Sequence, residues 1–379
     1  MYRGIKIQIY PTTDQIELIN TNINIFRGVY NLVLGLQLDN YSKGNSYIKF
    51  YEMCKIISNL RNNNENYRWL QDTTIGVIRE ALLNVDTAFQ MFFNKITKFP
   101  KFKSKKRSKK CFSTRSDRCY SDGNYVYVSG VGRIYCKNNK IPEDTRLHNV
   151  YISFDGYDKY YLSCSIDRDI QTNNEYHTGV IGIDVGIRNM ITTSDGDFYH
   201  FSDTTFYEKR LKRQNKRLLR YCSKYLEEAR RTKTKYEDIP KSKNMQKFLN
   251  KFFKTHQKIK NKRYNDIHVA TKSIISKSPK TIVIEDLDVL SIQNTIHKSV
   301  RPLVYFSEIH RQLIYKGEER GINVIKATRG YPSTQRCSCC GNIRKVYGSQ
   351  YKCKNCGLSI DRDLISAYNL RDFGINNIF

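Results

Sequence analysis

Apolar and polar positions alternate at the start of the chain and then change to a helical period. Residues 2–10 alternate between apolar and polar side chains, which predicts a β-strand that Pro11 ends. Thr12 followed by Gln15 matches a capping box, in which two side chains satisfy the first free N–H groups of a helix. Apolar residues at helical spacing continue to Val33, so a helix is predicted directly after the strand.

The rest of the chain mixes the two periods. Helical patterns lie around 47–60, 73–95 and 303–319, and 209–263 fits two long amphipathic helices. Residues 123–170 give short strands rich in Tyr, Val and Ile, which we expect to pair with the first strand in one small barrel or sheet. The chain of 379 residues is long enough for roughly two to three domains of mixed α and β structure.

Two apolar runs end in carboxylates. Residues 180–183 predict a buried strand with Asp184 near its end, and residues 281–284 run directly into Glu285 and Asp286. A carboxylate in a buried strand is costly unless it is paired or bound to a metal ion. Taken alone, Asp184 is equally well explained as a hydrogen-bonded core aspartate or a turn residue.

Cysteines near the C-terminal end have the spacing of a metal site. Cys337-x-x-Cys340 is followed after twelve residues by Cys353-x-x-Cys356, which is the ligand pattern of a four-cysteine zinc ribbon. Each CxxC turn places two thiolates on one side of a tight knuckle. Cys339 lies inside the first knuckle and is either a spectator or an alternative ligand.

A third carboxylate follows this ribbon. The triplet from Asp361 to Asp363 leads into the helical run LISAYNL. These could be solvated aspartates beside a folding staple, but strand ends on one edge of a sheet bring distant residues together. Asp184, Glu285 and Asp363 could not all stay ionised there without cations, and oxygen ligands favour Mg²⁺ or Mn²⁺. Two such ions about 3.5–4 Å apart would support phosphodiester hydrolysis.

The excess of basic over acidic residues bears on which molecules the protein binds. Lys and Arg number 65 against 36 Asp and Glu, a formal net charge of +29, which predicts attraction to polyanions. Lysine has A/T-rich codons, so a biased genome composition could raise the number of lysines. Such a bias would not gather the positive charges into clusters along the chain. Residues 95–110 hold nine basic residues and no acidic one, with Phe99 and Phe102 between them, and 209–263 hold 21 against four. Such runs are often solvated faces, yet interleaved aromatic rings favour contact with nucleic acid.

Eleven cysteines raise the question of secretion. The start MYRGIKIQIY reads as a strand rather than a signal peptide, and no stretch approaches the roughly 20 apolar residues that a membrane span needs. The cysteines outside the ribbon are scattered without pairing logic. We therefore expect an intracellular, reducing compartment and no membrane partner.

These features together resemble the TnpB (OrfB) family of insertion-sequence proteins, whose relatives are the Fanzor proteins and the type V CRISPR effectors. The resemblance runs nearly end to end. The stretches KIQIYPTTDQIELINTNINIFRGVYN and FPKFKSKKRSKKCFST resemble N-terminal segments of the family. Its first and second nuclease motifs are matched by IGIDVGIRNMITTSDG and TIVIEDLDVL, and its ribbon and third motif by CKNCGLSIDRDLISAYNL.

The resemblance implies an α+β multidomain fold, with a helical recognition and β-barrel wedge half before an RNase H-like (RuvC) α/β nuclease domain that carries an inserted four-cysteine zinc ribbon. The implied domains are a wedge of 1–10 and 96–172, a recognition region of 11–95, a nuclease domain of 178–332 and 361–379, and a ribbon of 333–360. The implied activity is Mg²⁺-dependent, RNA-guided cleavage of double-stranded DNA beside a short transposon-adjacent motif. The implied partners are a guide RNA from the transposon end and the target DNA.

The same resemblance assigns roles to residues. It implies that the catalytic magnesium (or manganese) ligands are Asp184, Glu285 and Asp363. It implies that the zinc ligands are Cys337, Cys340, Cys353 and Cys356. Nucleic-acid contacts are expected in the basic segment, at Lys101, Lys103, Lys105, Lys106 and Arg107.

Two departures from the family pattern bear on these roles. Where the family often has Asn two residues after the third aspartate, this chain has Ile365. This leaves Asp361 as an alternative to Asp363 for the third metal ligand. We favour Asp363, because Ala367 then falls at the alanine position of the family motif D-x-N-x-A. Cys339 is also unusual beside a metal knuckle. All three acidic positions are filled, which argues against a nuclease-inactive regulator. A DNA transposase acting by strand transfer and a ribbon module that only binds RNA are further alternatives.

Overall fold

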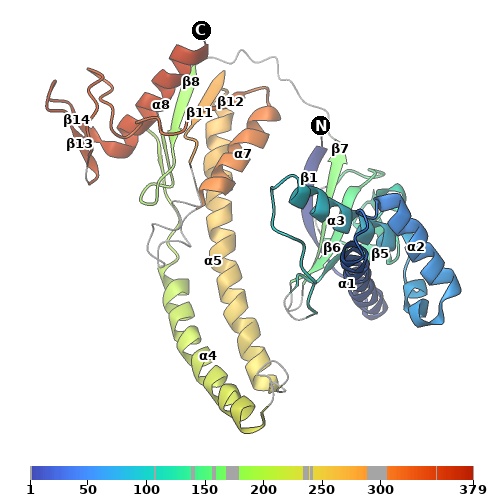
Figure 1. Cartoon of the computed structure of the whole chain (residues 1–379). Helices are drawn as coiled ribbons and strands as arrows, with labels where there is room; N and C mark the ends of the chain where they lie inside the picture. Colours follow the sequence, from blue (N-terminus) through green and yellow to red (C-terminus); the bar gives the residue numbers. More distant parts are fainter. Residues whose placement is uncertain are drawn as a thin grey trace. The chain divides into compact units, whose positions relative to one another are not determined.

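The computed structural model describes residues 2–105, 108–137, 141–155, 159–167, 179–233, 239, 242–287, 305–346 and 348–378. The chain divides into two compact units, Met1–Asp169 and Ile170–Phe379 (Figure 1). Both units contain helices and strands, which confirms the mixed α and β organisation expected from the sequence. Within these described ranges, no helix is long and apolar enough to cross a membrane.

The N-terminal unit combines helices with two antiparallel sheets. Its helical elements are α1 (Thr13–Ser42), α2 (Phe50–Asn63), η1 (Glu65–Asp72), α3 (Ile75–Phe93) and η2 (Ser116–Arg118). Its strands are β1 (Tyr2–Ile9), β2 (Cys111–Thr114), β3 (Tyr120–Asp122), β4 (Tyr125–Val128), β5 (Gly132–Tyr135), β6 (His148–Phe154) and β7 (Tyr160–Asp167).

The strands of this unit pair in the orders β1-β7-β6-β2 and β3-β4-β5. The first strand lies antiparallel to β7, with Ile9 opposite Tyr160, so the expected pairing between the start of the chain and the β-rich segment is confirmed. Isolated bridges from Tyr10 to Tyr135 and from Tyr120 to Arg146 join the two sheets. The closed barrel stays a prediction.

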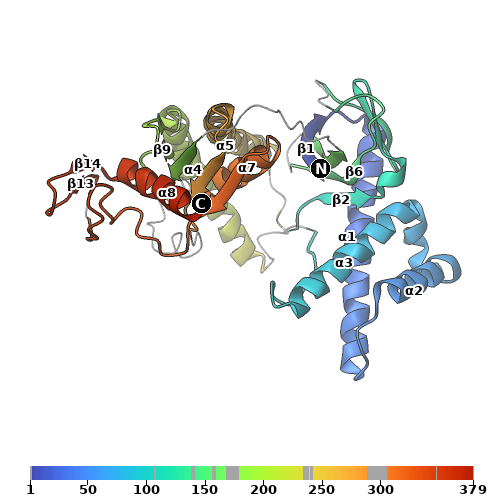
Figure 2. The same ribbon diagram turned by 90° about the horizontal axis from the view of Figure 1, so that it is seen from above.

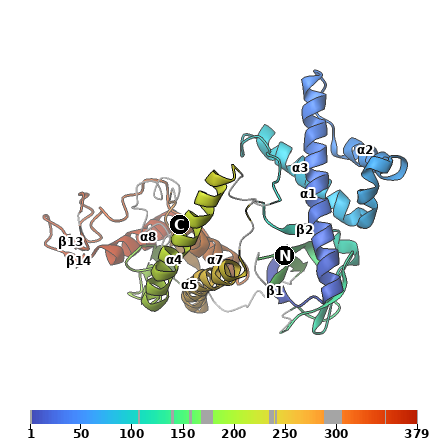
Figure 3. The ribbon, with the colours of Figure 1, turned by 90° about the horizontal axis from the view of Figure 1, so that it is seen from below.

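Helix α1 begins at the predicted capping box. The Thr12 hydroxyl oxygen accepts from the backbone N–H of Gln15 at 3.4 Å, and the Gln15 side chain accepts from the backbone N–H of Thr12 at 3.1 Å. The helix runs further than the apolar pattern indicated, to Ser42. Its buried stripe packs with α3 and the larger sheet in one hydrophobic core (Figure 3).

The C-terminal unit is built around one five-stranded sheet. Its strands are β8 (Val180–Asp184), β9 (Ile191–Thr193), β10 (Phe198–Tyr199), β11 (Thr281–Ile284) and β12 (Asn323–Lys326), in the order β10-β9-β8-β11-β12. The helices are α4 (Thr205–Arg231), α5 (Lys243–Ser276), α7 (Phe306–Glu318) and α8 (Arg362–Ile378), and β13 (Gln350–Lys352) pairs with β14 (Ser359–Asp361). Strands β8, β11 and β12 are parallel, so their carboxyl ends lie at one edge.

Both faces of the five-stranded sheet are covered by helices. Ile282 and Ile284 of β11 belong to a core that includes residues of α5 and α7. Val283, between them, packs with Leu370 of α8 on the opposite face. Successive strand residues point to opposite sides of a sheet, so α8 covers one face while α5 and α7 cover the other (Figure 2).

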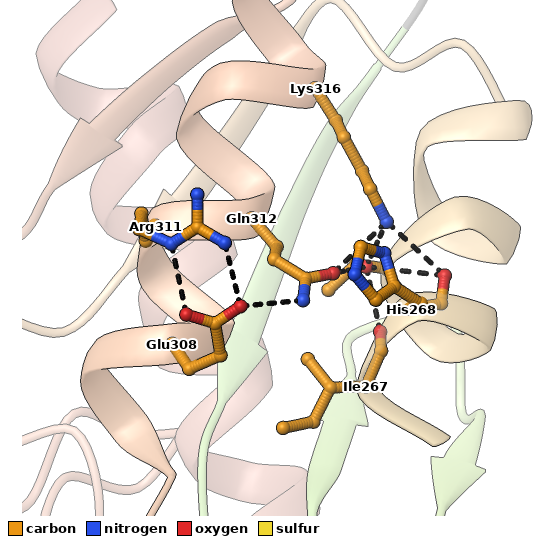
Figure 4. A network of polar contacts seen from close by, with 7 residues as sticks. Ile267, His268, Glu308, Arg311, Gln312 and Lys316 are labelled. Atoms are coloured by element: carbon orange, nitrogen blue, oxygen red, sulfur yellow. Dashed lines mark hydrogen bonds and ion pairs between the residues drawn. The ribbon is translucent and has the colours of Figure 1, made fainter. Parts of the chain in front are cut away.

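A polar network fixes α7 against α5 (Figure 4). The Lys316 ammonium donates to the Thr271 hydroxyl at 2.6 Å and to the backbone carbonyl of His268 at 3.2 Å. It also donates to the side-chain oxygen of Gln312, which is fully buried and donates in turn to Glu308 at 2.8 Å. Burial lowers the pKa of Lys316 to about 8. These contacts order the helix that precedes β12.

Helices α4 and α5 form the long basic hairpin that the sequence predicted, and in Figure 1 it extends well beyond the sheet. Arg263 of α5 is buried and forms an ion pair with Glu208 of α4 at 2.9 Å. The predicted break at Pro240 lies outside the described residues.

Candidate active site and metal centre

Two of the predicted acids stand on neighbouring parallel strands. Asp184 is the last residue of β8, and Glu285 directly follows β11. The register pairs Ile183 with Ile284, so the next residue on each strand is the acid. Asp184 and Glu285 therefore lie side by side at the carboxyl edge of the sheet.

The third predicted acid comes to this edge from α8. Asp363 lies in the first turn of α8, and the Ser366 hydroxyl, one turn further along, donates to Asp184 at 2.7 Å. The side-chain amide of Asn189, from the segment after β8, donates to Asp363 at 2.9 Å. Hydrogen bonds in both directions thus tie the start of α8 to the end of β8.

The environment makes it costly to ionise these acids together. Asp184 and Asp363 are 7% and 8% exposed, and Glu285 is partly buried. Burial raises the pKa of Asp184 to about 7; the Ser366 hydrogen bond opposes the rise, and the negative charges of Asp363 and Glu285 add to it. Burial also raises the pKa of Glu285. A divalent cation would offset this repulsion, and a carboxylate set is the ligand chemistry that Mg²⁺ and Mn²⁺ prefer.

The acids next to them in sequence have different partners. Asp286 forms ion pairs with Lys326 at 3.4 Å and Arg329 at 3.3 Å. Asp361 pairs with Arg188 at 2.5 Å, and its other oxygen accepts from the backbone N–H of Asp363 at 2.9 Å. Cationic side chains therefore already hold Asp286 and Asp361.

Asp184 and Asp363 instead receive neutral donors at the distances given above, and the guanidinium of Arg362 lies 3.8 Å from Asp363. The carboxylate oxygens are less closely gathered than the cysteine sulfur atoms, which form the single set of this kind in the described ranges.

The four predicted zinc ligands come together in space. Their sulfur atoms all lie within 4.8 Å of one another, and they are Cys337, Cys340, Cys353 and Cys356. The two knuckles are alike, because Gly341 and Gly357 each follow a CxxC pair at positive φ and donate a backbone hydrogen bond to its first cysteine. Tetrahedral zinc with Zn–S bonds of about 2.3 Å fits such a cluster.

Residues around the cluster form a small core of their own. Tyr351 and Ile365 are fully buried and pack with Cys337 and Cys353. Cys339 is exposed and lies outside the ligand set. Ile365 occupies the position where the family often has Asn, and here it connects α8 to the ribbon rather than facing the acids.

The basic segment gives a mixed result. Lys101 and Lys105 are exposed, whereas Lys106 and Arg107 lie outside the described residues. The Lys103 ammonium sits 3.6 Å from the centre of the Tyr30 ring, and burial lowers the pKa of Lys103. Lys103 thus anchors the segment to α1.

A groove opens between this segment and α1, with a volume of about 890 Å³. Basic side chains are prominent in its lining, namely Arg27, Lys103, Lys105, Lys109 and Lys110.

Sequence reasoning missed Asn189 and Ser366, although both lie within the quoted motifs. The available signal was their spacing, since Asn189 follows Asp184 within one loop and Ser366 follows Asp363 by one helical turn. Gly186 lies in the same loop, and a Cβ atom there would lie 2.8 Å from the Asn189 carbonyl oxygen. Only glycine lets the loop fold back over the acids.

Family models match three separate parts of the chain. Family models match residues 1–46 ("Helix-turn-helix domain" of OrfB/IS605 proteins), 161–294 ("Probable transposase", OrfB/IS605) and 306–370 ("Cas12f1-like, TNB domain"). Together they span the first strand, the basic hairpin, both strand-end acids and the cysteine cluster.

Relatives align over almost the full length. The chain is 26% identical over 388 residues to "Putative RNA-guided DNA endonuclease InsQ" of Escherichia coli (strain K12), covering 97% of this chain and 91% of the relative. It is 24% identical over 383 residues to "Putative RNA-guided DNA endonuclease" of Streptomyces pristinaespiralis, covering 98% and 89%. A solved structure of CasPhi-2 (Cas12j) bound to crRNA aligns over 98% of both chains with 11% identity and a TM-score of 0.47. The family models and the two bacterial relatives thus confirm the resemblance to the TnpB (OrfB) family that the sequence motifs indicated.

Proposed function

We propose that this chain is an RNA-guided DNA endonuclease of transposon origin. The names of its two full-length relatives support the activity. The observation that carries the proposal is the arrangement of Asp184, Glu285 and Asp363 at the carboxyl edge of one sheet, where each is wholly or partly buried and the first two are neighbours across β8 and β11. Divalent cations would offset the cost of ionising three carboxylates in this environment.

The fold of the catalytic unit is proposed to be RNase H-like (RuvC). Support comes from the mixed sheet β10-β9-β8-β11-β12, which α8 covers on one face and α5 and α7 on the other. The proposed nuclease domain takes residues 178–332 and 361–379, and the zinc ribbon takes 333–360. In the N-terminal unit, the bridges between the two sheets support a barrel-like wedge of 1–10 and 96–172, and residues 11–95 are proposed to form the helical recognition region.

The proposed chemistry assigns Asp184, Glu285 and Asp363 as ligands of Mg²⁺ or Mn²⁺. When bound, such ions activate a water molecule and stabilise the leaving oxygen of a phosphodiester. The chain holds Asp184 and Glu285 side by side through strand pairing, and it holds Asp363 through the docking of α8. We assign Asp363 rather than Asp361 because Asp361 is occupied by Arg188 and by the start of α8.

The proposed partners are a guide RNA from the transposon end and a double-stranded DNA target beside a short adjacent motif. The basic hairpin of α4 and α5 and the groove beside Lys105 support binding of phosphate backbones, since the net charge is +29. We propose that the protein acts on this DNA inside the cell. Zn²⁺ is proposed at the four cysteines as a folding element of the ribbon.

The second candidate is a DNA transposase that acts by strand transfer. The family description "Probable transposase" favours it, and the same basic surfaces and acids would serve it. A regulator without nuclease activity is less well supported, because all three acids are present. The products separate these candidates: hydrolysis leaves free ends, whereas strand transfer joins the cut end to a new DNA molecule.

The test begins with protein expressed beside its native flanking DNA and purified through a high-salt wash. We expect a discrete bound RNA that ends in flanking sequence, and Mg²⁺-dependent cutting of DNA that matches it. The Asp184→Ala variant should bind the same RNA without cutting. Heterogeneous RNA, joined DNA products, or cutting by Asp184→Ala would each contradict the proposal.

A further inference from the structure

Two neutral side chains hold the proposed metal ligands from opposite sides of the site. The Ser366 hydroxyl donates to Oδ1 of Asp184 at 2.7 Å, and the Asn189 amide donates to Oδ2 of Asp363 at 2.9 Å. Ser366 is fully buried and Asn189 is 3% exposed, so water does not compete for these bonds. Neither donor has a role in the chemistry proposed above.

The two bonds form a reciprocal brace. The end of β8 carries one acid, Asp184, and the segment that follows carries Asn189, the donor to the other acid. The first turns of α8 carry Asp363 and the donor to Asp184. Each acid is thus oriented by the segment that bears its partner, and a shift of either segment would break both bonds. Gly186 permits this arrangement, because a Cβ atom there would lie 2.8 Å from the carbonyl oxygen of Asn189.

The neutrality of the donors suits a cation site. A lysine or arginine in the same place would satisfy the carboxylate with a permanent positive charge and would compete with a metal ion. A hydroxyl or amide fixes one oxygen and leaves the remaining lone pairs free to coordinate. The acids next to them in sequence differ in this respect, because Asp286 and Asp361 form ion pairs with cationic side chains at 3.4 Å or less.

We propose that Ser366 and Asn189 are positioning residues that orient Asp184 and Asp363 for binding of a divalent cation. The inference rests on the proposed metal role of the three acids. The two residues set the affinity of the site for the ion and do not touch the phosphodiester. Hydrogen-bonding partners of metal ligands typically contribute 10–100-fold to metal affinity.

The experiment measures Mn²⁺ binding directly, by titration of the zinc-loaded full chain with Mn²⁺ and detection of free Mn²⁺ by electron paramagnetic resonance. Ser366→Ala and Asn189→Ala are compared with wild type, with Asp184→Asn as the blank. Ser113→Ala is the matched control, because it removes a buried hydroxyl in the N-terminal unit that makes no hydrogen bond among the described residues.

We expect about tenfold weaker Mn²⁺ binding in Ser366→Ala and in Asn189→Ala, with melting temperatures in the absence of Mn²⁺ lowered by only a few degrees, because each variant loses one buried hydrogen bond. The Mg²⁺ concentration for half-maximal cleavage should rise by a similar factor, while the rate at saturating Mg²⁺ recovers. Wild-type affinity in both variants would overturn the inference and leave the proposed function standing. Failure of wild type to bind more Mn²⁺ than Asp184→Asn would overturn both.

Discussion

The backbone of Gly182 in β8 lies directly against the backbone of Ala367 in α8. A Cβ atom on Gly182 would be 2.0 Å from the Ala367 carbonyl oxygen and 2.4 Å from the Arg371 nitrogen. Gly374, two turns further along α8, also lies close to the sheet, where a Cβ atom would be 2.4 Å from the side chain of Val283. These glycines allow α8 to approach the sheet closely enough for Ser366 to reach Asp184.

We expect Gly182→Ala to destabilise the C-terminal unit by about 3 kcal/mol or more, because the contacted atoms are backbone and cannot rotate away. Gly4→Ala is the matched control: it too lies in a strand, and no atom comes within 4 Å of its Cβ position. The control should change stability by about 0.5 kcal/mol or less.

The measurement is urea unfolding followed by two signals. Trp69, the single tryptophan, lies in the N-terminal unit, so its fluorescence should report an unchanged transition in Gly182→Ala. Far-ultraviolet circular dichroism, which sees both units, should show an earlier loss of helix. Equal stability of Gly182→Ala and Gly4→Ala would contradict the packing described for α8.

Asp363→Asn and Asp361→Asn separate the two candidates for the third acid. We expect Asp363→Asn to lower the cleavage rate at least a hundredfold, because metal ligation accounts for several kcal/mol of transition-state stabilisation. Asp361→Asn keeps an oxygen that can cap α8 and loses an ion pair with the exposed Arg188, which is worth about 1 kcal/mol at most.

The rate of the Asp361→Asn variant should therefore stay within about tenfold of wild type. Cleavage is measured in single-turnover conditions with guide RNA at saturation, so that RNA binding does not enter. A larger loss in Asp361→Asn than in Asp363→Asn would reverse the assignment.

Strand and helix positions were largely predictable, because the spacing of apolar residues along a short stretch of chain indicates which element forms there. The apolar runs before Asp184 and Glu285 became β8 and β11, and the capping box at Thr12 starts α1 as expected. The cysteine cluster was equally accessible, since CxxC spacing alone brings pairs of thiols together.

Contacts between distant segments were not predictable. Ser366 and Asp184 are 182 positions apart, and no period in the sequence indicates that one side chain donates to the other. Lys103 looked like the other basic residues of its segment, yet it packs on the Tyr30 ring because the chain returns to α1. Side-chain partners of this kind depend on how helices and strands dock against one another, and the pattern of residues along a single sequence does not reveal that docking.

The raised pKa of Asp184 predicts how stability depends on pH when no divalent cation is bound. The folded-state pKa is about 7 against an ordinary value of 3.8, so the folded chain binds this proton more tightly than the unfolded chain. The resulting stabilisation is fully present below pH 3.8, falls as the pH rises, and is lost above about pH 7.

Asp184→Asn removes this titration and stays neutral throughout. Its stability relative to wild type should therefore increase between those two pH values, by up to about 4 kcal/mol. Urea midpoints of the zinc-loaded proteins across this range provide the measurement. Addition of Mn²⁺ should reduce the difference, because the ion binds the ionised wild-type site. Parallel pH profiles for the two proteins would contradict the burial of an ionisable Asp184.

Zinc removal tests the cysteine cluster, with Cys339 as an internal control. We expect one zinc ion per wild-type chain and per Cys339→Ser chain, because the Cys339 side chain is exposed and outside the set of four sulfur atoms. Cys353→Ser removes a buried ligand and should abolish stoichiometric zinc, since three thiolates leave the tetrahedral site incomplete.

The consequence should extend beyond the ribbon. Ile365 of α8 packs with Cys337, Cys353 and Tyr351, so loss of zinc loosens the helix that carries Asp363. We therefore expect Cys353→Ser to weaken Mn²⁺ binding at the carboxylate site as well as zinc binding. Atomic absorption gives the zinc content, and hydrogen exchange gives the protection of the first turns of α8. Unchanged protection of α8 in zinc-free Cys353→Ser would show that the ribbon and the carboxylate site are structurally independent.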